Sequence, residues 1–440
     1  MEAIYEKLSI LDYPITKDFF LLFWGSKVEW EKLKKENNIV LNDEESYSVN
    51  IKVKLDIERK QELHLEIYSM YLEYFEDNKT LHYEELQELI DLLKKASYHS
   101  RKCDQYNELI NAIYSVFKWL IFWNISIKWF WKYIEEISIG NLDDDLKARL
   151  IYCKNFKKVL PRFEMDNYED VNQDLNSLLK KNSDLRFQFQ VVNLLGLLNL
   201  QAGNYKLSFK KFEKCRKIAE ELNSQQFRGI VLLNESTVCN QLDNSDKSIT
   251  LLKKTMVIFK EEEYYHYVSK YNYLNLLFGQ DEDIEEYLPS TEEIINLIDK
   301  YPDVVKLFVG LKRKVAIKKN EYQLYFFLKS IGLYIGQRLY QEDYLREFFS
   351  LINRITDWAK DKRSEVRKGL KFIIDTYKTM EMDDERLFFE TYQKVLSQEP
   401  IDISDYKAKI KNSSLKDLLC ERIKNLQKIL VKDVSEEETE

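Results

Sequence analysis

The spacing of apolar residues is the feature that most constrains the fold of this chain. Apolar residues recur at i, i+3, i+4 and i+7 along almost the whole sequence, and hardly any segment alternates with a period of two. Only 10 of the 440 residues are Gly and 5 are Pro, so the chain lacks the residues that the many tight turns of sandwiches and barrels require. We therefore predict an all-α protein of roughly twenty helices with essentially no sheet.

The sequence contains no familiar catalytic or cofactor motif. The patterns GxGxxG, GxxxxGK(S/T), HExxH, CxxC and GxSxG are all absent. The four His are not spaced as metal ligands, so neither a metal nor a cofactor is expected, and no catalytic residue is assigned. A binding protein is the favoured class, and an enzyme is left open.

The charge balance indicates the class of partner, and the spacing of the cysteines indicates the cellular compartment. The 67 basic and 75 acidic residues are mixed and give a net charge of −8, so direct binding of nucleic acid is not expected. The 5 cysteines stand far apart, as in reduced proteins. Because the N-terminus has no basic region and no long apolar core, we expect no secretory signal and predict a cytoplasmic protein.

A tryptophan-rich stretch, KWLIFWNISIKWFWKYI, lies within residues 105–139. A membrane-spanning helix needs about twenty mostly apolar residues, whereas Lys118, Asn124, Lys128 and Lys132 interrupt this run. We therefore predict a buried helix pair at a domain junction and no membrane span. Interfacial membrane binding and a face that docks a partner are the alternatives.

A period of forty residues appears when residues 190–219 are laid on 230–259. The first copy has Gly196 in one helix and a turn at Gly203-Asn204-Tyr205, and its second helix carries a small, an aromatic and a small residue. These are Ser208, Phe212 and Cys215, and their counterparts in the second copy are Ser248, Leu252 and Thr255, with Ser236 in place of Gly196. The spacing resembles the tetratricopeptide repeat, whose small residues let two helices cross closely. A fainter copy has Tyr344 at the turn position.

These observations divide the chain into four parts. We predict an N-terminal helical bundle at 1–160, tetratricopeptide-like repeats at 161–360, a C-terminal helical extension at 361–431 and an acidic tail at 432–440. Stacked helical hairpins would form a right-handed superhelix whose first helices line a concave groove. Residues that this frame places in the groove are Gln190, Asn193, Gln201, Asn234, Thr237, Asn240 and Gln241.

Neutral amides dominate that set, and Asn and Gln each carry both a donor and an acceptor. They can therefore pair with the backbone of an extended peptide without demanding a charged ligand. We predict a regulatory scaffold that binds a peptide or protein partner in this groove. The alternative is that these are ordinary solvated polar positions.

Residues 185–261, which follow a long helical N-terminal region, resemble the Rap-type peptide-controlled regulators of Gram-positive bacteria. Asn234 matches the family's asparagine in the first helix of a repeat, where the resemblance implies contact with peptide backbone. Ser236 stands at the family's small position, and about seventy residues follow the last repeat-like unit. The resemblance implies a signalling-peptide receptor whose N-terminal helices hold an effector protein, as in quorum sensing. No helix-turn-helix is recognisable near the N-terminus, which argues against DNA binding.

Two other functions stay open at this point. The chain can be a structural subunit of a larger assembly, with a homodimer as one form. It can also be an all-helical ribonuclease, because the spacing of Arg59 and His64 resembles the R-x4-H pair of the HEPN type. In that pair a base accepts the proton of the 2′-hydroxyl, and a cation stabilises the charge that develops on the phosphate.

Overall fold

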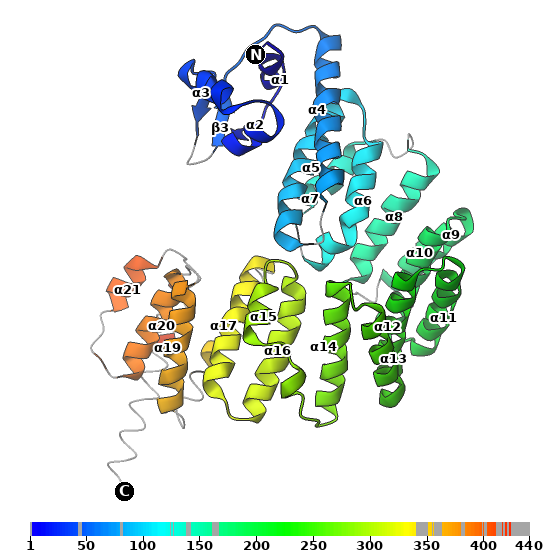
Figure 1. Ribbon diagram of the computed structural model, residues 1–440, viewed down its shortest axis with the longest axis vertical. Helices are drawn as coiled ribbons and strands as arrows, with labels where there is room; N and C mark the ends of the chain where they lie inside the picture. Colours follow the sequence, from blue (N-terminus) through cyan, green and yellow to red (C-terminus); the bar gives the residue numbers. More distant parts are fainter. Residues whose placement is uncertain are drawn as a thin grey trace. The chain divides into compact units, whose positions relative to one another are not determined.

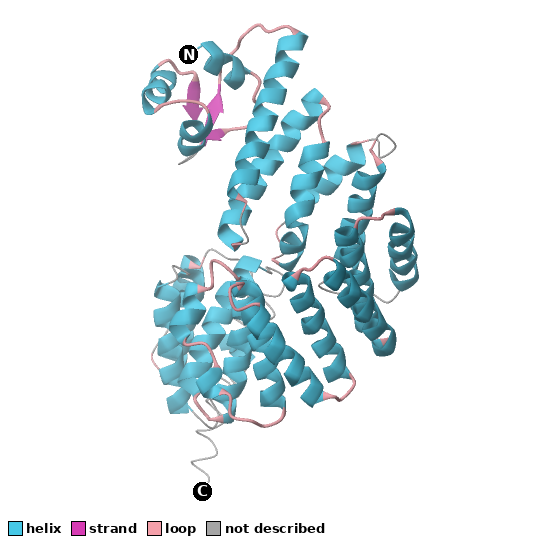
Figure 2. Ribbon diagram, turned by 45° about the vertical axis from the view of Figure 1, so that its right-hand side comes forward, coloured by secondary structure: helices cyan, strands magenta, loops and turns pink. Residues whose placement is uncertain are grey.

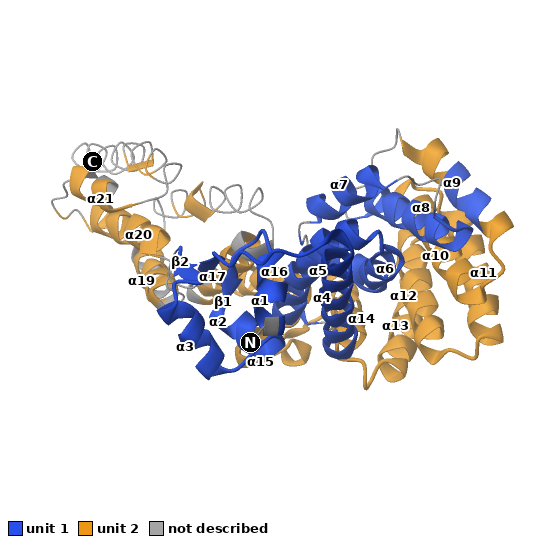
Figure 3. Ribbon diagram, turned by 90° about the horizontal axis from the view of Figure 1, so that it is seen from above, with its two compact units in different colours: residues 1–121, 125–162, 173–178 blue, residues 122–124, 163–172, 179–440 orange. Residues whose placement is uncertain are grey.

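The computed structural model describes residues 2–42, 46–79, 82–123, 125, 127–137, 142–160, 167–339, 351–353, 355, 363–379, 383–397, 399, 403–410, 416, 419 and 422–423. This part of the chain is almost entirely helical, which confirms the predicted all-α class (Figure 1). It separates into two units (Figure 3). Unit 1 contains residues 1–121, 125–162 and 173–178, and unit 2 contains residues 122–124, 163–172 and 179–440.

The first fifty residues of unit 1 contain a small sheet that the apolar spacing did not predict. The elements are α1 (Glu2–Ser9), β1 (Ile15–Thr16), α2 (Lys17–Phe23), α3 (Lys27–Lys35), β2 (Ile39–Leu41) and β3 (Ser46–Val49). The strands are drawn in magenta in Figure 2. They pair antiparallel in the order β1-β3-β2, with Ile15 opposite Tyr47 and Val40 opposite Ser48. Strands of two to four residues are too short to show a period of two.

The same segment corrects the expectation that no helix-turn-helix lies near the N-terminus. The short turn 24–26 joins α2 to α3, and the element order with this sheet topology is that of a winged helix-turn-helix. Ser26 and Glu29 form a capping box that starts α3, and the buried rings of Phe20 and Trp30 pack 5.2 Å apart between the two helices. Helices this short show only two turns of apolar spacing, which hides the motif in the sequence. Such a fold does not by itself assign a ligand.

Longer helices follow. They are α4 (Ile57–Asn78), α5 (Tyr83–Cys103), α6 (Asn107–Phe122), α7 (Lys128–Glu136) and α8 (Asp144–Val159). The tryptophan-rich stretch forms α6 and α7, and Trp119 and Trp123 are fully buried. Across the described residues, no helix is long and apolar enough to cross a membrane.

The helical hairpins that the forty-residue period predicts lie in the middle of the chain. They comprise α10 (Leu185–Gln201) with α11 (Tyr205–Glu221), and α12 (Gln225–Gln241) with α13 (Ser245–Ile258). The helix α9 (Tyr168–Lys181) precedes them, and α14 (Glu263–Gly279) follows. The turns are alike, because Gly203 and Asp243, forty residues apart, both adopt positive φ, at 75° and 57°.

The small residues of the repeat lie where the two helices of a hairpin cross. The Ser208 hydroxyl donates to the carbonyl oxygen of Gly196 at 2.8 Å, and the Ser248 hydroxyl donates to that of Ser236 at 2.8 Å. A Cβ atom on Gly196 would overlap the buried ring of Phe212. The tetratricopeptide-like repeat is therefore confirmed at the level of its packing.

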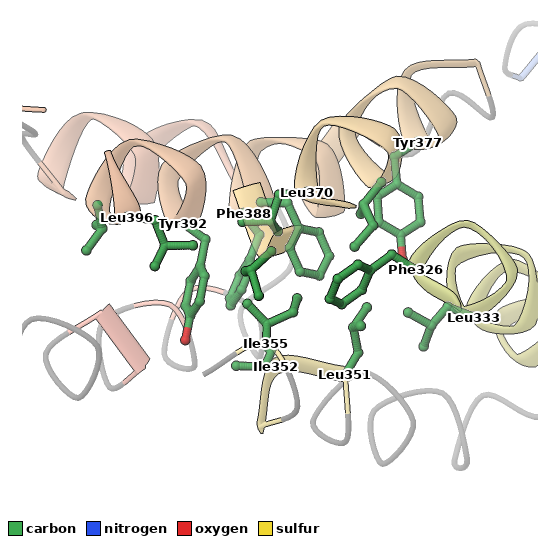
Figure 4. Close-up of a cluster of buried hydrophobic side chains, with 14 of the residues drawn as sticks. Phe326, Leu333, Leu351, Ile352, Ile355, Leu370, Tyr377, Phe388, Tyr392 and Leu396 are labelled. Carbon is green, nitrogen blue, oxygen red and sulfur yellow. The ribbon is translucent and has the colours of Figure 1, made fainter. Parts of the chain in front are cut away.

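The remaining helices of unit 2 continue the helical array. They are α15 (Thr291–Asn296), α16 (Pro302–Lys318), α17 (Tyr322–Leu339), α19 (Arg363–Thr379), α20 (Asp383–Leu396) and α21 (Ile403–Lys409). Figure 4 shows the core between α17, α19 and α20, where Phe326, Tyr377 and Phe388 gather with aliphatic side chains. This cluster contains residues from both sides of position 360. The faint repeat copy with Tyr344 and the acidic tail 432–440 lie outside the described residues, and the four-part division stays a prediction.

Candidate binding face of the helical repeats

The predicted binding residues lie on the first helices of two consecutive hairpins. α10 carries Gln190, Asn193 and Gln201, whose separations of three and eight residues place them on one side of the helix. On α12, separations of three and four residues align Asn234, Thr237 and Gln241, with Asn240 beside them. We call this surface the amide face.

Asn193 and Asn234 meet on the amide face. The Nδ2 atom of Asn234 donates to Oδ1 of Asn193 at 2.8 Å, and both side chains are half-buried. In the described part of the chain, the Nδ2 of Asn193 and the Oδ1 of Asn234 have no hydrogen-bond partner. The pair therefore bridges two repeats and still offers one donor and one acceptor, the complement of one peptide group.

The other predicted residues do not converge on this pair. The Thr237 hydroxyl donates to the carbonyl oxygen of Leu233 in its own helix at 3.3 Å. Gln241 accepts from the Tyr205 hydroxyl at 3.3 Å, and Gln190 is half-buried on α10. Gln201 and Asn240 are exposed near the ends of their helices. Asn193 and Asn234 are thus joined to each other, whereas Thr237 and Gln241 bond to residues outside the predicted set.

The helix that follows the second hairpin, α14, adds aromatic surface. Most side chains of α14 are half-buried. The rings of Tyr267 and Tyr271 meet the edge of Phe308 with centroids 6.1 and 5.8 Å apart, and burial raises the pKa of both tyrosines. The signal for this surface was the run YYHYVSKYNY, in which tyrosines follow one another too densely for a single buried stripe.

A half-buried carboxylate, that of Asp303, anchors the start of α14. Asp303 accepts from the Tyr264 hydroxyl at 2.8 Å and from the indole Nε1 of Trp123 at 2.9 Å. Burial raises the pKa of Asp303, and these two donors oppose that rise. The tryptophan-rich stretch therefore reaches into unit 2 at residue 123.

A fully buried carboxylate, that of Glu235, lies between the repeats. The Glu235 side chain is 1% exposed and accepts from the guanidinium of Arg216, which is 43% exposed. Burial raises the pKa of Glu235, and the hydrogen bond from Arg216 is the largest opposing effect. This ion pair fixes α11 against α12.

The structure does not bring Arg59 and His64 into one site. The Arg59 guanidinium pairs with Glu6, Glu62 and Glu66. His64 is 6% exposed, and its Nδ1 lies 2.8 Å from Nδ1 of His99. A buried imidazole cannot reach a 2′-hydroxyl, so the geometry does not support the ribonuclease alternative.

A shallow pocket of ≈ 500 Å³ lies beside the turn of the first hairpin. It is lined by residues 203–207 and by Leu242. Because Tyr205 contacts Gln241, the pocket lies at the edge of the amide face where consecutive turns meet. We call it the turn pocket.

Metal and thiol chemistry find no support in the described residues. Within them no three His, Cys, Asp or Glu side chains cluster so as to hold a metal ion. Burial raises the pKa of the Cys153 and Cys215 thiols well above the ordinary value, which makes both poor nucleophiles.

No family model and no curated protein matches the chain. A solved structure to which it is similar is a Signal Transduction ATPase with Numerous Domains (STAND) protein with a tetratricopeptide repeat sensor, from Pyrococcus horikoshii. The two share 14% sequence identity with a TM-score of 0.35, over 96% of this chain and 64% of that one. The chain thus spans less than two thirds of that protein, and a likeness at this level assigns it no function.

Proposed function

We propose that this chain is a regulatory scaffold that binds an extended peptide or protein segment on the amide face of α10 and α12. The observation that carries the proposal is the half-buried Asn193–Asn234 pair, with its remaining donor and acceptor. A peptide group bound there would contact two repeats at once. A ligand shifts the equilibrium between two conformations only if its contacts differ between them. A peptide bound across two repeats would make such contacts, so binding there would change the angle between the hairpins.

In its finer form, the proposal is a cytoplasmic receptor for a signalling peptide, which controls an effector protein held by the N-terminal helices. The resemblance of residues 185–261 to Rap-type regulators supports it, with Asn234 at the matching asparagine. Cys103, Cys153, Cys215 and Cys239 are free thiols, which fits a reducing compartment.

Native mass spectrometry of the protein purified gently from its own host tests the proposal. We expect a bound mass of about 0.5–1.5 kDa, the range of a short peptide. The Asn193→Ala/Asn234→Ala double variant should lose it. A Gln61→Ala/Gln87→Ala variant is the matched control, because both side chains are exposed amides of α4 and α5, outside the amide face.

The double variant should remain folded, because it removes both partners of the hydrogen bond and leaves no amide unpaired. Its free energy of unfolding is expected to change by less than about 1 kcal/mol. Equal occupancy of the double variant and the wild type would exclude the amide face as the binding site. A bound protein subunit without peptide would favour the structural-subunit alternative.

A further inference from the structure

The outward side of α11 carries a row of lysines. Lys206, Lys210, Lys214 and Lys217 are all exposed. Their separations of four, four and three residues align them along one side of the helix, over about 16 Å. We call these four residues the lysine row.

The lysine row is not neutralised by the chain. None of its four ammonium groups is in an ion pair with any described residue, although Glu213 and Glu221 lie three or four residues from its members. By contrast, Lys318 and Lys319 at the end of α16 are paired, Lys318 with Asp281 and Lys319 with Asp283 and Glu285. The four ammonium groups outnumber the nearby carboxylates, so they raise the potential along α11 and attract acidic groups.

Aliphatic surface lies at the first turn of α11, beside the start of the row. Leu207 is 43% exposed and Leu242 is 45% exposed, and both line the turn pocket together with Lys206. Large exposed aliphatic side chains around a concavity mark a contact surface rather than a solvated one. The lysine row and the turn pocket therefore form one continuous surface, which shares Lys206.

We propose that the lysine row and the turn pocket are a docking surface for an acidic segment of a partner protein. The carboxylates of the segment would face the lysine row, and one aliphatic side chain would enter the turn pocket. The charge of the row argues for an acidic partner, and the two leucines argue for the aliphatic anchor. This surface lies on the second helix of the repeat and does not use Asn193 or Asn234, so it is independent of the proposed function.

The side chains beside the lysine row favour a protein segment over RNA. Single-stranded nucleic acid needs open aromatic faces on which bases stack. Here the ammonium of Lys247 lies over the ring of Phe209 at 5.0 Å, and the Tyr205 hydroxyl is bonded to Gln241.

Selection from a random twelve-residue peptide library displayed on phage, with the full chain as bait, tests the proposal. We expect the enriched peptides to combine several Asp or Glu with an aliphatic residue. Synthetic copies should bind the K206Q/K210Q/K214Q/K217Q variant at least about tenfold more weakly, and salt should weaken their binding to the wild type. The L207S/L242S variant should prefer peptides that lack the aliphatic residue.

The matched control neutralises four exposed lysines of unit 1 that have no ion pair with a described residue. They are Lys27, Lys35, Lys52 and Lys94. This variant should bind the peptides as the wild type does, and circular dichroism verifies that all variants are folded. Enriched peptides without acidic residues, or peptides that bind the lysine-row variant undiminished, would overturn the proposal. So would a labelled 20-nucleotide single-stranded RNA that binds more tightly than the peptides and depends on the same four lysines.

Discussion

His64 and His99 meet through their Nδ1 atoms, which lie 2.8 Å apart in the core between α4 and α5. Only one of the two atoms can carry the shared proton, so the ring that accepts it must be neutral, and burial disfavours a charge on either ring. The far nitrogen of His99, Nε2, lies 2.9 Å from the Tyr13 hydroxyl, which ties the N-terminal segment to the same cluster. Burial lowers the pKa of His64 to about 4 and that of His99 to about 3, and the charge of Lys102 adds to the effect on His64.

We expect the stability of the protein to fall as the pH drops below about 6.5. The unfolded chain binds protons on both histidines near that pH, whereas the folded chain binds them only near pH 4 and 3. Between these values the unfolded state holds more protons, so acid favours it, by about 1.4 kcal/mol per pH unit for each histidine. Urea denaturation between pH 7.5 and 4.5 measures the slope.

The His64→Gln variant should lose about half of that slope. Tyr13→Phe is the control, because it removes the hydroxyl but keeps both imidazoles. It should lower the stability at every pH and leave the slope intact. Equal slopes in the wild type and His64→Gln would mean that the pair does not cause the acid sensitivity.

Gly196→Ala should destabilise the protein by about 1–3 kcal/mol, because the new methyl group overlaps the Phe212 ring and the hairpin must open. Gly310→Ala in α16 is the opposite case. Among the described residues, no atom outside the adjoining backbone of its own helix lies within 4 Å of the added Cβ, so alanine should stabilise the helix by about 0.5–1 kcal/mol. Urea denaturation measures the free energy of unfolding of both variants. An equal loss in each would show that the close helix crossing at Gly196 is not what makes alanine unfavourable there.

Ser248→Ala should cost only about 1 kcal/mol, the value of the lost hydrogen bond to the Ser236 carbonyl. Ser248→Leu should cost at least about 2 kcal/mol, since the side chain is 1% exposed and the crossing has no space for it. Thermal unfolding by circular dichroism ranks the two variants. Similar midpoints would show that position 248 can hold a larger side chain.

Arg216→Met should destabilise the protein by about 2–3 kcal/mol at pH 7, because it leaves the buried Glu235 carboxylate without its partner. This loss is smaller than the cost of breaking a fully buried ion pair, because Arg216 is 43% exposed. Without the cation the pKa of Glu235 rises further. A carboxyl whose folded pKa is raised destabilises the fold as the pH increases, so the loss should shrink at pH 5.

Adding Glu235→Gln to Arg216→Met should restore most of the lost stability, because a neutral amide needs no cation. A double-mutant cycle by urea denaturation measures the coupling. A double variant no more stable than Arg216→Met would show that the guanidinium acts through packing rather than charge.

Local features of the fold could be predicted from the sequence, and the contacts between distant segments could not. The period of forty residues located the turn at Gly203 and the crossing of Gly196 with Ser208, because both depend on helix geometry and on side-chain volume. The strands of the winged helix-turn-helix escaped prediction, since segments of two to four residues carry no readable period.

The sequence by itself determined that this chain is helical, that its middle repeats every forty residues, and that polar amides occupy the first helices of the repeat. Only the tertiary structure decided which of these amides meet. Asn193 and Asn234 are 41 residues apart and are not equivalent positions of the repeat, yet the packing of α10 against α12 joins them. Periodicity follows from the geometry of one helix, whereas such a contact depends on how closely two helices approach and at what angle they cross.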